Sequence, residues 1–375
     1  MFRNLKADGH SSRQDWTIRL FVFACLLISC APLRAQNYLE NVGIPTFTTA
    51  IPVENGIIDA GSGNLHLEIP LGSFPQRGGR QYRVALVYDS AIWQPVNGSW
   101  QPTNVSTADG SAPSWGGWRL VTSGDIGIVH PSSPQTNCYG PFIWTAPDGT
   151  QHSFSINTAL PTNSCSMADT PTGNAFASDA TGFHMYVSNY THSIIKAPDG
   201  TKVYDDTSSS AQRLEDSNGN YYYFSAGTIT DTVGRTPVTT AVNGSTITYT
   251  LPNTQGTNST FTATTSAITV STTFGQTGTS EYSGSITAIT KITLPDGTYY
   301  QFGYDSGFGL LNSVTLPTGA AIPYSFTTFT DAYNSKYRWV NTRNTPDGPW
   351  TFTSTVLVQC TSTTQYNCQQ QFTVT

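Results

Sequence analysis

The stretch Thr293-Leu-Pro-Asp-Gly-Thr-Tyr-Tyr-Gln-Phe-Gly-Tyr-Asp305, followed by Val314-Thr-Leu-Pro-Thr-Gly319, decides the fold class of this chain. Its Pro-Asp-Gly and Pro-Thr-Gly triplets are typical of tight turns, because proline presets a turn angle and glycine accepts a positive φ. A run of aromatic residues lies between the two turns. The order predicts β-strands separated by tight turns.

The aromatic residues of this stretch alternate with smaller or polar ones. Successive side chains of a strand point to opposite faces, so Tyr300, Phe302 and Tyr304 share one face, while Tyr299 and Gln301 share the other. We expect the first three side chains to be more buried than the other two.

Composition favours an all-β protein for the rest of the chain. Only 11% of the residues are charged, against roughly 25% in globular proteins, so Ser, Thr and Asn must supply the polar surface. Thr, Tyr, Phe and Val favour sheets, and Asn, Gly and Pro favour their turns. Beyond residue 35 we find no helical apolar stripe and expect little helix.

Charge argues against nucleic acid as a partner. The chain carries a net charge of −6, and removing the five basic and two acidic groups of the first 35 residues leaves 12 basic against 21 acidic. A basic stripe of the kind that binds phosphate backbones is absent from the sequence.

The first 35 residues predict export. Arg13 and Arg19 precede the apolar run 20–28, and a small residue, Ala35, stands at a cleavable position. The run is short for a permanent span, so we expect a secreted or cell-surface protein without a transmembrane segment after cleavage. Leu27-Ile-Ser-Cys30 also resembles a lipobox, in which Cys30 would be acylated and anchor the chain to the cell envelope.

Four cysteines remain after the signal region. An even number in an exported chain favours disulfides, and no Cys-x2-Cys or matched histidine spacing points to zinc. Proximity in sequence favours Cys138–Cys165 and Cys360–Cys368, although three connectivities are formally open.

Internal repetition predicts stacked hairpins. Pro-Asp-Gly begins at residues 147, 198, 295 and 346, and a further turn at 242–245 fits near the middle of the longest interval. We divide the chain into a signal peptide at 1–35, an N-terminal β region at 36–130, and a hairpin region at 131–375 that ends within a repeat.

These turns, with the strand patterns at 65–71 and 81–90 and the phrase Trp115-Gly-Gly-Trp-Arg-Leu120, resemble the shell of the RHS family of large bacterial proteins. The residues that match its YD repeat are Pro295, Asp296, Gly297, Tyr304, Asp305, Gly309, Pro317 and Gly319. The resemblance implies a curved sheet of antiparallel hairpins that encloses or presents an effector. The aspartate-rich self-cleavage motif of that family has no counterpart here, so self-cleavage is not carried over.

Candidate catalytic and metal sites are outweighed by structural interpretations. Asp216-Ser-Asn-Gly-Asn220 lacks the spacing of an EF-hand and fits a hairpin with Asn218-Gly219 in a type I′ turn. His66 and His152 alternate with apolar residues, which predicts solvent-facing strand positions. The carboxylate pairs 205–206 and 215–216 fit solvated turns, since neighbours on a strand cannot face one another. We predict no catalytic, cofactor-binding or metal residue.

Two functions remain, with a third held in reserve. The first is a non-catalytic RHS-type structural shell, completed by another protein chain. The alternative is a carbohydrate-binding or adhesion module that uses exposed aromatic residues on cell-surface glycans; five tryptophans are candidates, namely Trp93, Trp100, Trp115, Trp118 and Trp144. The third is a secreted hydrolase, although the sequence shows no arrangement of residues typical of acid/base catalysis.

Overall fold

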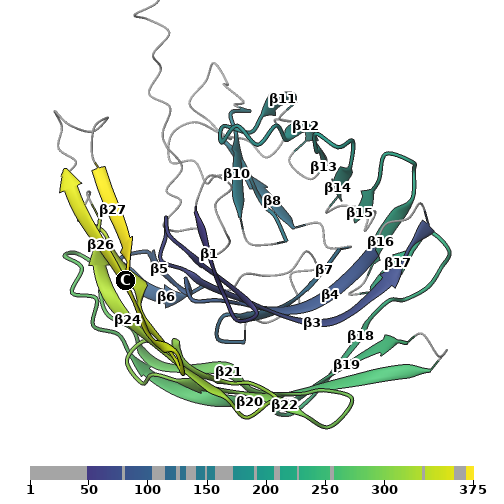
Figure 1. The fold of residues 1–375 in the computed structure, drawn as a ribbon. Coiled ribbons are helices and arrows are strands. Elements are labelled where there is room, and N and C mark those ends of the chain that lie inside the picture. The colour runs from purple at the N-terminus through teal and green to yellow at the C-terminus, as the bar shows by residue number, and fades with distance from the viewer. Residues whose placement is uncertain are drawn as a thin grey trace, which may run out of the picture. The chain divides into compact units, whose positions relative to one another are not determined.

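The structure is a computed structural model in which every strand belongs to an antiparallel sheet (Figure 1). It describes residues 49–77, 81–103, 115–123, 127–131, 141–147, 150–156, 172–189, 192–206, 212–225, 228–253, 257–331, 334–358 and 369–375. These segments contain no α-helix, which confirms the all-β class. The predicted signal peptide, Cys30 and the four disulfide candidates lie outside the described residues.

The N-terminal region forms a five-stranded sheet in the order β1-β2-β3-β4-β7. Its strands are β1 (Ala50–Val53), β2 (Gly56–Asp59), β3 (Leu65–Pro75), β4 (Gln81–Asp89) and β7 (Trp118–Thr122). Alternate residues of β3 are buried, as the sequence predicts, because one face of this strand packs into the core. In β4 the alternation ends at Val84, since residues 84–89 are all buried. A separate hairpin of β5 (Trp93–Val96) and β6 (Ser99–Pro102) follows β4.

The largest sheet has ten strands that follow one another in chain order. They are β18 (Thr239–Asn243), β19 (Thr246–Pro252), β20 (Asn258–Ser271), β21 (Ser283–Thr293), β22 (Tyr299–Tyr304), β23 (Leu311–Thr315), β24 (Ala321–Thr330), β25 (Lys336–Thr345), β26 (Gly348–Val358) and β27 (Gln369–Val374). Tyr299 and Gln301 are exposed, whereas Phe302 is buried and Tyr300 and Tyr304 are partly buried, which confirms the predicted alternation.

The middle of the chain forms two smaller sheets. The three-stranded sheet has the order β10-β9-β8, from β8 (Ile128–Pro131), β9 (Phe142–Thr145) and β10 (Gln151–Phe154). The seven-stranded sheet runs in chain order through β11 (Gly173–Phe176), β12 (His184–Asn189), β13 (His192–Lys196), β14 (Lys202–Asp206), β15 (Gln212–Glu215), β16 (Tyr221–Ser225) and β17 (Thr228–Asp231).

One five-residue turn recurs throughout these sheets. At 294–298, the N–H of Leu294 bonds the carbonyl of Thr298, and the N–H of Gly297 bonds the carbonyl of Leu294. The same two bonds recur at 197–201, 216–220, 231–235, 316–320 and 331–335. The fourth residue of each turn has a positive φ, between 65° and 87°, which explains why it is glycine in all but one case.

One predicted turn follows this pattern against expectation, and two others differ from it. Asn218 does not share the positive φ of Gly219, so the turn at 216–220 is the common five-residue turn and the predicted type I′ turn is wrong. The turn expected at 242–245 exists, where Gly244 and Ser245 join β18 to β19. In the last Pro-Asp-Gly triplet, Gly348 already pairs with Thr345, which leaves a two-residue turn.

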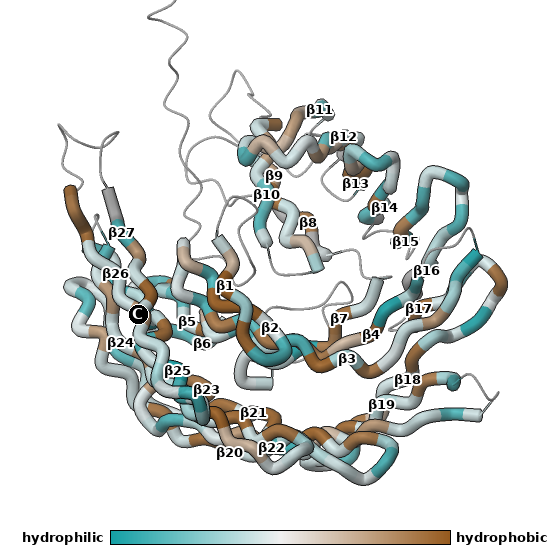
Figure 2. The backbone as a smooth tube through the Cα atoms, in the orientation of Figure 1, coloured by the Kyte–Doolittle hydropathy of each residue, from teal (hydrophilic) through white to brown (hydrophobic). Residues whose placement is uncertain are grey.

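Four hydrophobic clusters lie among the described residues, and the two with the most residues are the main cores of the sheets. The larger core combines residues of the five-stranded and ten-stranded sheets, among them Leu86, Trp118, Phe302 and Val340, with Tyr222 and Ile229 from the last two strands of the seven-stranded sheet. The smaller core combines the three-stranded sheet with the adjoining half of the seven-stranded sheet, through Phe142, Trp144, Met185, Ile195 and Val203. Figure 2 shows the corresponding alternation of hydrophobic and hydrophilic positions along the strands.

Candidate functional site

The residues that match the YD repeat hold turns and core contacts. Asp296 caps its turn by accepting hydrogen bonds from the N–H and Oγ1 of Thr298, at 2.9 and 2.7 Å. These bonds hold the pKa of Asp296 below its usual value. Pro295 and Gly297 complete this exposed turn, and Pro317 and Gly319 occupy the equivalent places in the next one.

Tyr304 and Asp305 have different structural roles. The hydroxyl of Tyr304 accepts a 2.9 Å hydrogen bond from Nε1 of Trp118 and donates to the carbonyl of Ile289. Burial raises the pKa of this hydroxyl well above its usual value. Asp305 accepts three backbone N–H groups in the turn that ends at Leu310. The Tyr-Asp dipeptide therefore joins the two large sheets and closes a turn.

A buried carboxylate, Asp89, anchors the five-stranded sheet. It accepts hydrogen bonds from Nη1 of Arg119 at 2.5 Å, Nδ2 of Asn64 at 2.8 Å and Nδ1 of His66 at 2.8 Å. Burial alone would raise the pKa of Asp89, but the positive charge of Arg119 outweighs it and the pKa is lowered. For His66, burial favours a lower pKa, and the Asp89 carboxylate reverses this to a raised pKa. His66 is thus partly buried and ion-paired, and its predicted solvent-facing position is wrong.

A second His–Asp pair lies in the smaller core. His152 is only 2% exposed, so its predicted solvent-facing position is also wrong. Its Nδ1 lies 2.6 Å from Oδ2 of Asp179, whose other oxygen accepts hydrogen bonds from the N–H and Oγ1 of Thr181. The imidazole ring stacks against Trp144 and meets the edge of Phe183. Because aromatic rings enclose the imidazole, we interpret the His152–Asp179 pair as a buried polar contact that stabilises the smaller core.

The two carboxylate pairs need a correction as well. Asp205 is buried within β14, where it accepts hydrogen bonds from the N–H of Val129 and from Nε2 of Gln212. It is therefore a link between strands rather than part of a solvated turn. Asp216 does head a turn, but it is buried and accepts the N–H groups of Asn218 and Asn220. Within the described segments, no group of three or more His, Cys, Asp and Glu residues could hold a metal ion.

The tryptophans proposed for sugar stacking are not available to a ligand. Trp93, Trp100, Trp118 and Trp144 are each at most 8% exposed, and Trp115 packs against the larger core. They fill the interior because a large aromatic side chain contributes most where its surface leaves water. Any aromatic binding surface has to be formed by other residues.

Such a surface exists on the seven-stranded sheet, on the face opposite the smaller core. Strand pairing aligns its side chains in two rows that cross the strands. The first row consists of Phe176, His184, Lys196, Lys202, Glu215 and Tyr221. The second row consists of Asn174, Tyr186, Ile194, Tyr204, Arg213, Tyr223 and Thr230. We call the two rows together the tyrosine face.

Large apolar groups are unusually exposed on this face. Phe176 is 66% exposed, Tyr186 43% and Tyr221 39%, while Tyr204 and Tyr223 are partly exposed. Single exposed apolar residues are ordinary, but a contiguous series of them marks an interaction site. The ring of Phe176 lies 4.2 Å from that of His184, and the His184 ring lies 4.3 Å from that of Tyr186, so the rings form a continuous surface.

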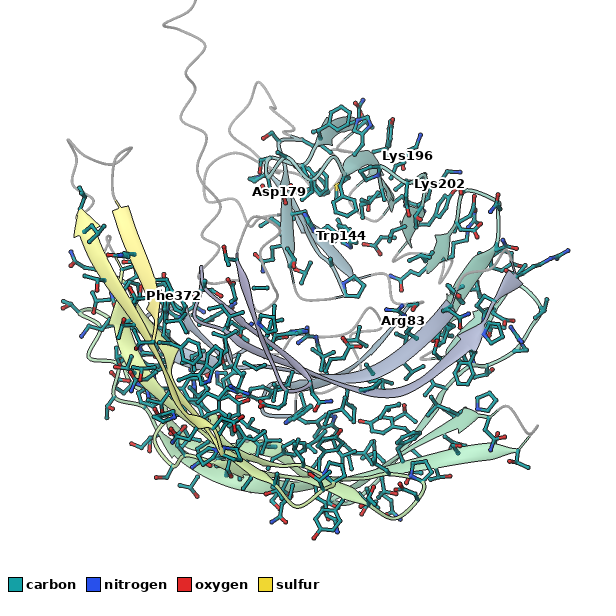
Figure 3. All side chains as sticks on the ribbon, viewed as in Figure 1. Arg83, Trp144, Asp179, Lys196, Lys202 and Phe372 are labelled. Atoms are coloured by element: carbon teal, nitrogen blue, oxygen red, sulfur yellow. The ribbon has the colours of Figure 1, made fainter. Side chains whose placement is uncertain are left out.

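The charges on the tyrosine face are mainly positive. Lys196, Lys202 and Arg213 stand against one carboxylate, Glu215, which lies 3.2 Å from Nζ of Lys202 and 3.0 Å from Nη2 of Arg213. The hydrogen bond that Lys202 donates to Glu215 raises the pKa of Lys202. The guanidinium of Arg213 lies 4.1 Å from the ring centre of Tyr204. Figure 3 shows Lys196 and Lys202 pointing away from the smaller core, where Trp144 and Asp179 lie.

The spacing of the tyrosines suits an extended ligand. Tyr186, Tyr204 and Tyr223 stand on every second strand, so they repeat at about 10 Å, twice the distance between neighbouring strands. The hollow beside Tyr221 and Asp216 has a volume of about 10 Å³, room for about one water molecule. The geometry therefore favours a chain laid across the strands over a small molecule held in that hollow.

Sequence reasoning missed this face, although a signal was present. Tyr186 and Tyr204 each stand next to a buried aliphatic residue, and Tyr223 stands next to the buried Tyr222, but the strand register was needed to bring the three tyrosines together. No protein-family model matches the chain, and no curated protein matches it at a significant level. The RHS resemblance thus stays a prediction.

Proposed function

We propose that this chain is an exported, non-catalytic β-sheet protein of the RHS type whose tyrosine face binds an extended anionic polysaccharide. The observation that carries the proposal is the double row of aromatic and basic side chains across the seven-stranded sheet. This proposal combines the predicted structural shell with the predicted glycan binding. A scaffold of hairpins can present a binding face without catalysing a reaction.

The side chains of the face match the chemistry of a sugar chain. Tyrosine offers an apolar ring to the C–H face of a sugar and a hydroxyl to its polar edge. Asn174 and Thr230, at opposite ends of the second row, add uncharged hydrogen-bonding groups. The excess of cations over carboxylates favours uronate or sulfate groups on the ligand, because opposite charges bring it to the surface and orient it.

The decisive experiment compares polymers that differ in charge. Binding of polygalacturonate, dextran sulfate and uncharged dextran is measured by calorimetry at low and high salt, with the protein as exported. We expect the two anionic polymers to bind and dextran to bind at least tenfold more weakly, a difference of about 1.4 kcal/mol. Added salt should weaken binding of the anionic polymers, since their exposed charges are screened.

Variants separate ring stacking from charge alone. The double change Tyr186→Ala and Tyr204→Ala should weaken polygalacturonate binding at least tenfold while every cation is kept. The matched control is Lys291→Ala with Tyr299→Ala, because that lysine also stands 4.0 Å from a tyrosine ring centre but lies on the ten-stranded sheet. Equal loss in both variants, or full binding by the first, would refute the assignment to the tyrosine face.

The same incubations test for turnover. Reducing ends are counted after prolonged contact with each polymer, and we expect none above the blank. Release of reducing ends that disappears when Asp179 or His152 is replaced by alanine, in a variant that still folds, would contradict the non-catalytic proposal.

A further inference from the structure

The first strand of the ten-stranded sheet has one neighbour among the described residues. β18 pairs with β19 and stands at the end of the strand order (Figure 1). All five of its residues are exposed, and Val242 is 57% exposed. The last strand of the same sheet differs, since Phe372 of β27 packs against the core. β18 therefore presents a backbone edge with both of its faces accessible.

This edge lacks the usual protection of an outer strand. Exposed edges commonly carry charge, proline or a bulge that prevents pairing with another chain. The edge strand β1 contains Pro52, and the edge strand β17 contains Asp231. β18, with the sequence Thr-Thr-Ala-Val-Asn, contains neither proline nor charge, and its pairing with β19 is regular.

The surroundings of β18 are also free of charge. From Thr236 to Ser280 the sequence contains no Asp, Glu, Lys, Arg or His. The protein as a whole is acidic, so two copies repel one another wherever carboxylates meet. At this neutral segment two copies can approach without that cost. Charge thus favours a second copy of the same chain as the occupant of the edge.

The backbone groups of β18 that face outward are defined by its hairpin. Asn243 and Thr246 flank a two-residue turn and therefore exchange both of their hydrogen bonds. Hydrogen-bonding direction alternates along a strand, so the N–H and C=O groups of Thr240 and Val242 point away from β19. These two residues supply the groups that a further strand would bond.

From this geometry we infer that two copies of the chain pair through β18, antiparallel and about a two-fold axis at Ala241. In this register Thr240 lies opposite Val242 of the second copy, and each such pair exchanges two hydrogen bonds. The small side chain of Ala241 meets its own counterpart on the axis. A closed two-fold dimer results, in which the two ten-stranded sheets become continuous.

The inference does not depend on the tyrosine face, which lies on another sheet. One strand pair buries less surface than the roughly 1,200–2,000 Å² of a standard interface, so we expect a dissociation constant in the micromolar range. Sedimentation velocity from about 1 μM to about 1 mM should show a monomer–dimer transition. A single monomeric species over the whole range would overturn the inference.

Charge variants test the register. Thr240→Lys with Val242→Lys opposes like charges across the axis and should abolish the dimer, as should Thr240→Glu with Val242→Glu. Mixing the two variants should restore a dimer that contains one copy of each. The control Ser266→Lys with Thr287→Lys adds the same charge to exposed positions of β20 and β21, which pair with each other there and lie inside the strand order, and it should dimerise normally.

A backbone variant provides an independent check. Val242→Pro removes one outward N–H group but leaves the bonds to β19 in place, so the chain should fold and its dimer should weaken at least tenfold. A circular dichroism melt reports folding for each variant. Dimerisation of the folded lysine variant, or no dimer in the mixture of opposite charges, would refute pairing through β18.

Discussion

The seven-stranded and the ten-stranded sheets both run through their strands in chain order, and both turn at the same five-residue hairpin. They differ in the faces that lie away from the cores. The seven-stranded sheet carries exposed rings, lysines and an arginine there. The outer face of β19 and β20, in the other sheet, consists mostly of threonine and other small polar residues.

This contrast separates the requirements of folding from those of binding. A hairpin sheet needs one buried face and suitable turns, and both sheets satisfy this with aliphatic and aromatic residues. Threonine is sufficient on the other face, because it favours strands and tolerates water. The tyrosines and cations of the seven-stranded sheet exceed this need, and their excess is the argument for a ligand.

The largest expected difference between the two sheets comes from truncating an aromatic ring. Phe302, 5% exposed in the larger core, should lose about 3–5 kcal/mol of unfolding free energy on change to Ala. Tyr204→Ala on the tyrosine face should cost only about 1 kcal/mol, mainly the contact with Arg213. Urea unfolding measures both. A cost above about 3 kcal/mol for Tyr204 would make that residue structural and weaken the functional contrast.

Glycines in the two sheets should also differ. Gly309 has a φ of +65°, and a Cβ there would stand 2.5 Å from Cδ1 of Ile286, so Gly309→Ala meets both strain and a clash. Gly219, with a φ of +78°, has no neighbouring atom within 4 Å. We expect about 1–2 kcal/mol for Gly219→Ala from backbone strain alone, and more for Gly309→Ala. Equal costs, measured by urea unfolding, would show that the core at Gly309 yields to a methyl group.

Local patterns were sufficient to predict the fold class and most turns. The alternation of residues predicted which side chains of β22 are buried. The Pro-Asp-Gly triplets predicted turns, because proline has a restricted φ and glycine accepts a positive one. The type I′ turn at Asn218 failed because Asp216 accepts backbone N–H groups and holds a different turn. A side-chain acceptor of this kind competes with the intrinsic preference of Asn-Gly.

The candidate site could not be predicted, because it depends on register between strands. Tyr186 and Tyr204 lie far apart in sequence and are joined only through their pairing with Ile194. The predicted exposure of the two histidines was wrong for a similar reason. Alternation placed His66 and His152 correctly on strands, but Asp89 and Asp179, which allow their burial, come from other segments. Sequence patterns report faces, whereas burial of a polar group depends on its partner.

The two His–Asp pairs predict different pH dependence for the two regions. The folded-state pKa of His66 lies above its ordinary value of 6.5, so its contribution to stability is complete below about pH 6.5 and is lost as pH rises through the raised pKa. Urea midpoints should therefore fall as pH rises above about 6.5, and the change His66→Gln should flatten this slope. An unchanged slope in the variant would assign the effect to another group.

Asp179 should act in the acid range instead. Burial favours a higher pKa for this carboxyl, but the hydrogen bonds from Thr181 outweigh it, and the pKa is lowered from 3.8. Its contribution is present above about pH 3.8 and is lost as pH falls through the lowered pKa. Asp89 loses its contribution in the same direction. Thr181→Val should raise the pKa of Asp179, as carboxyl carbon NMR titration would show, and leave the neutral-range slope unchanged.

The smallest expected effect is a change in ligand affinity, and its sign shows whether the charges of the tyrosine face bind a ligand or only stabilise the fold. Glu215 neutralises part of the charge of Lys202 and Arg213, so Glu215→Gln leaves more positive charge for an anionic polymer. We expect polygalacturonate to bind about threefold more tightly, well below the tenfold change that 1.4 kcal/mol represents, and the gain should vanish at high salt. A purely structural ion pair predicts the opposite, namely lower stability and no gain in binding. Calorimetry of the folded variant at two salt concentrations distinguishes these outcomes, because only a surface that meets an anion benefits from losing its own carboxylate.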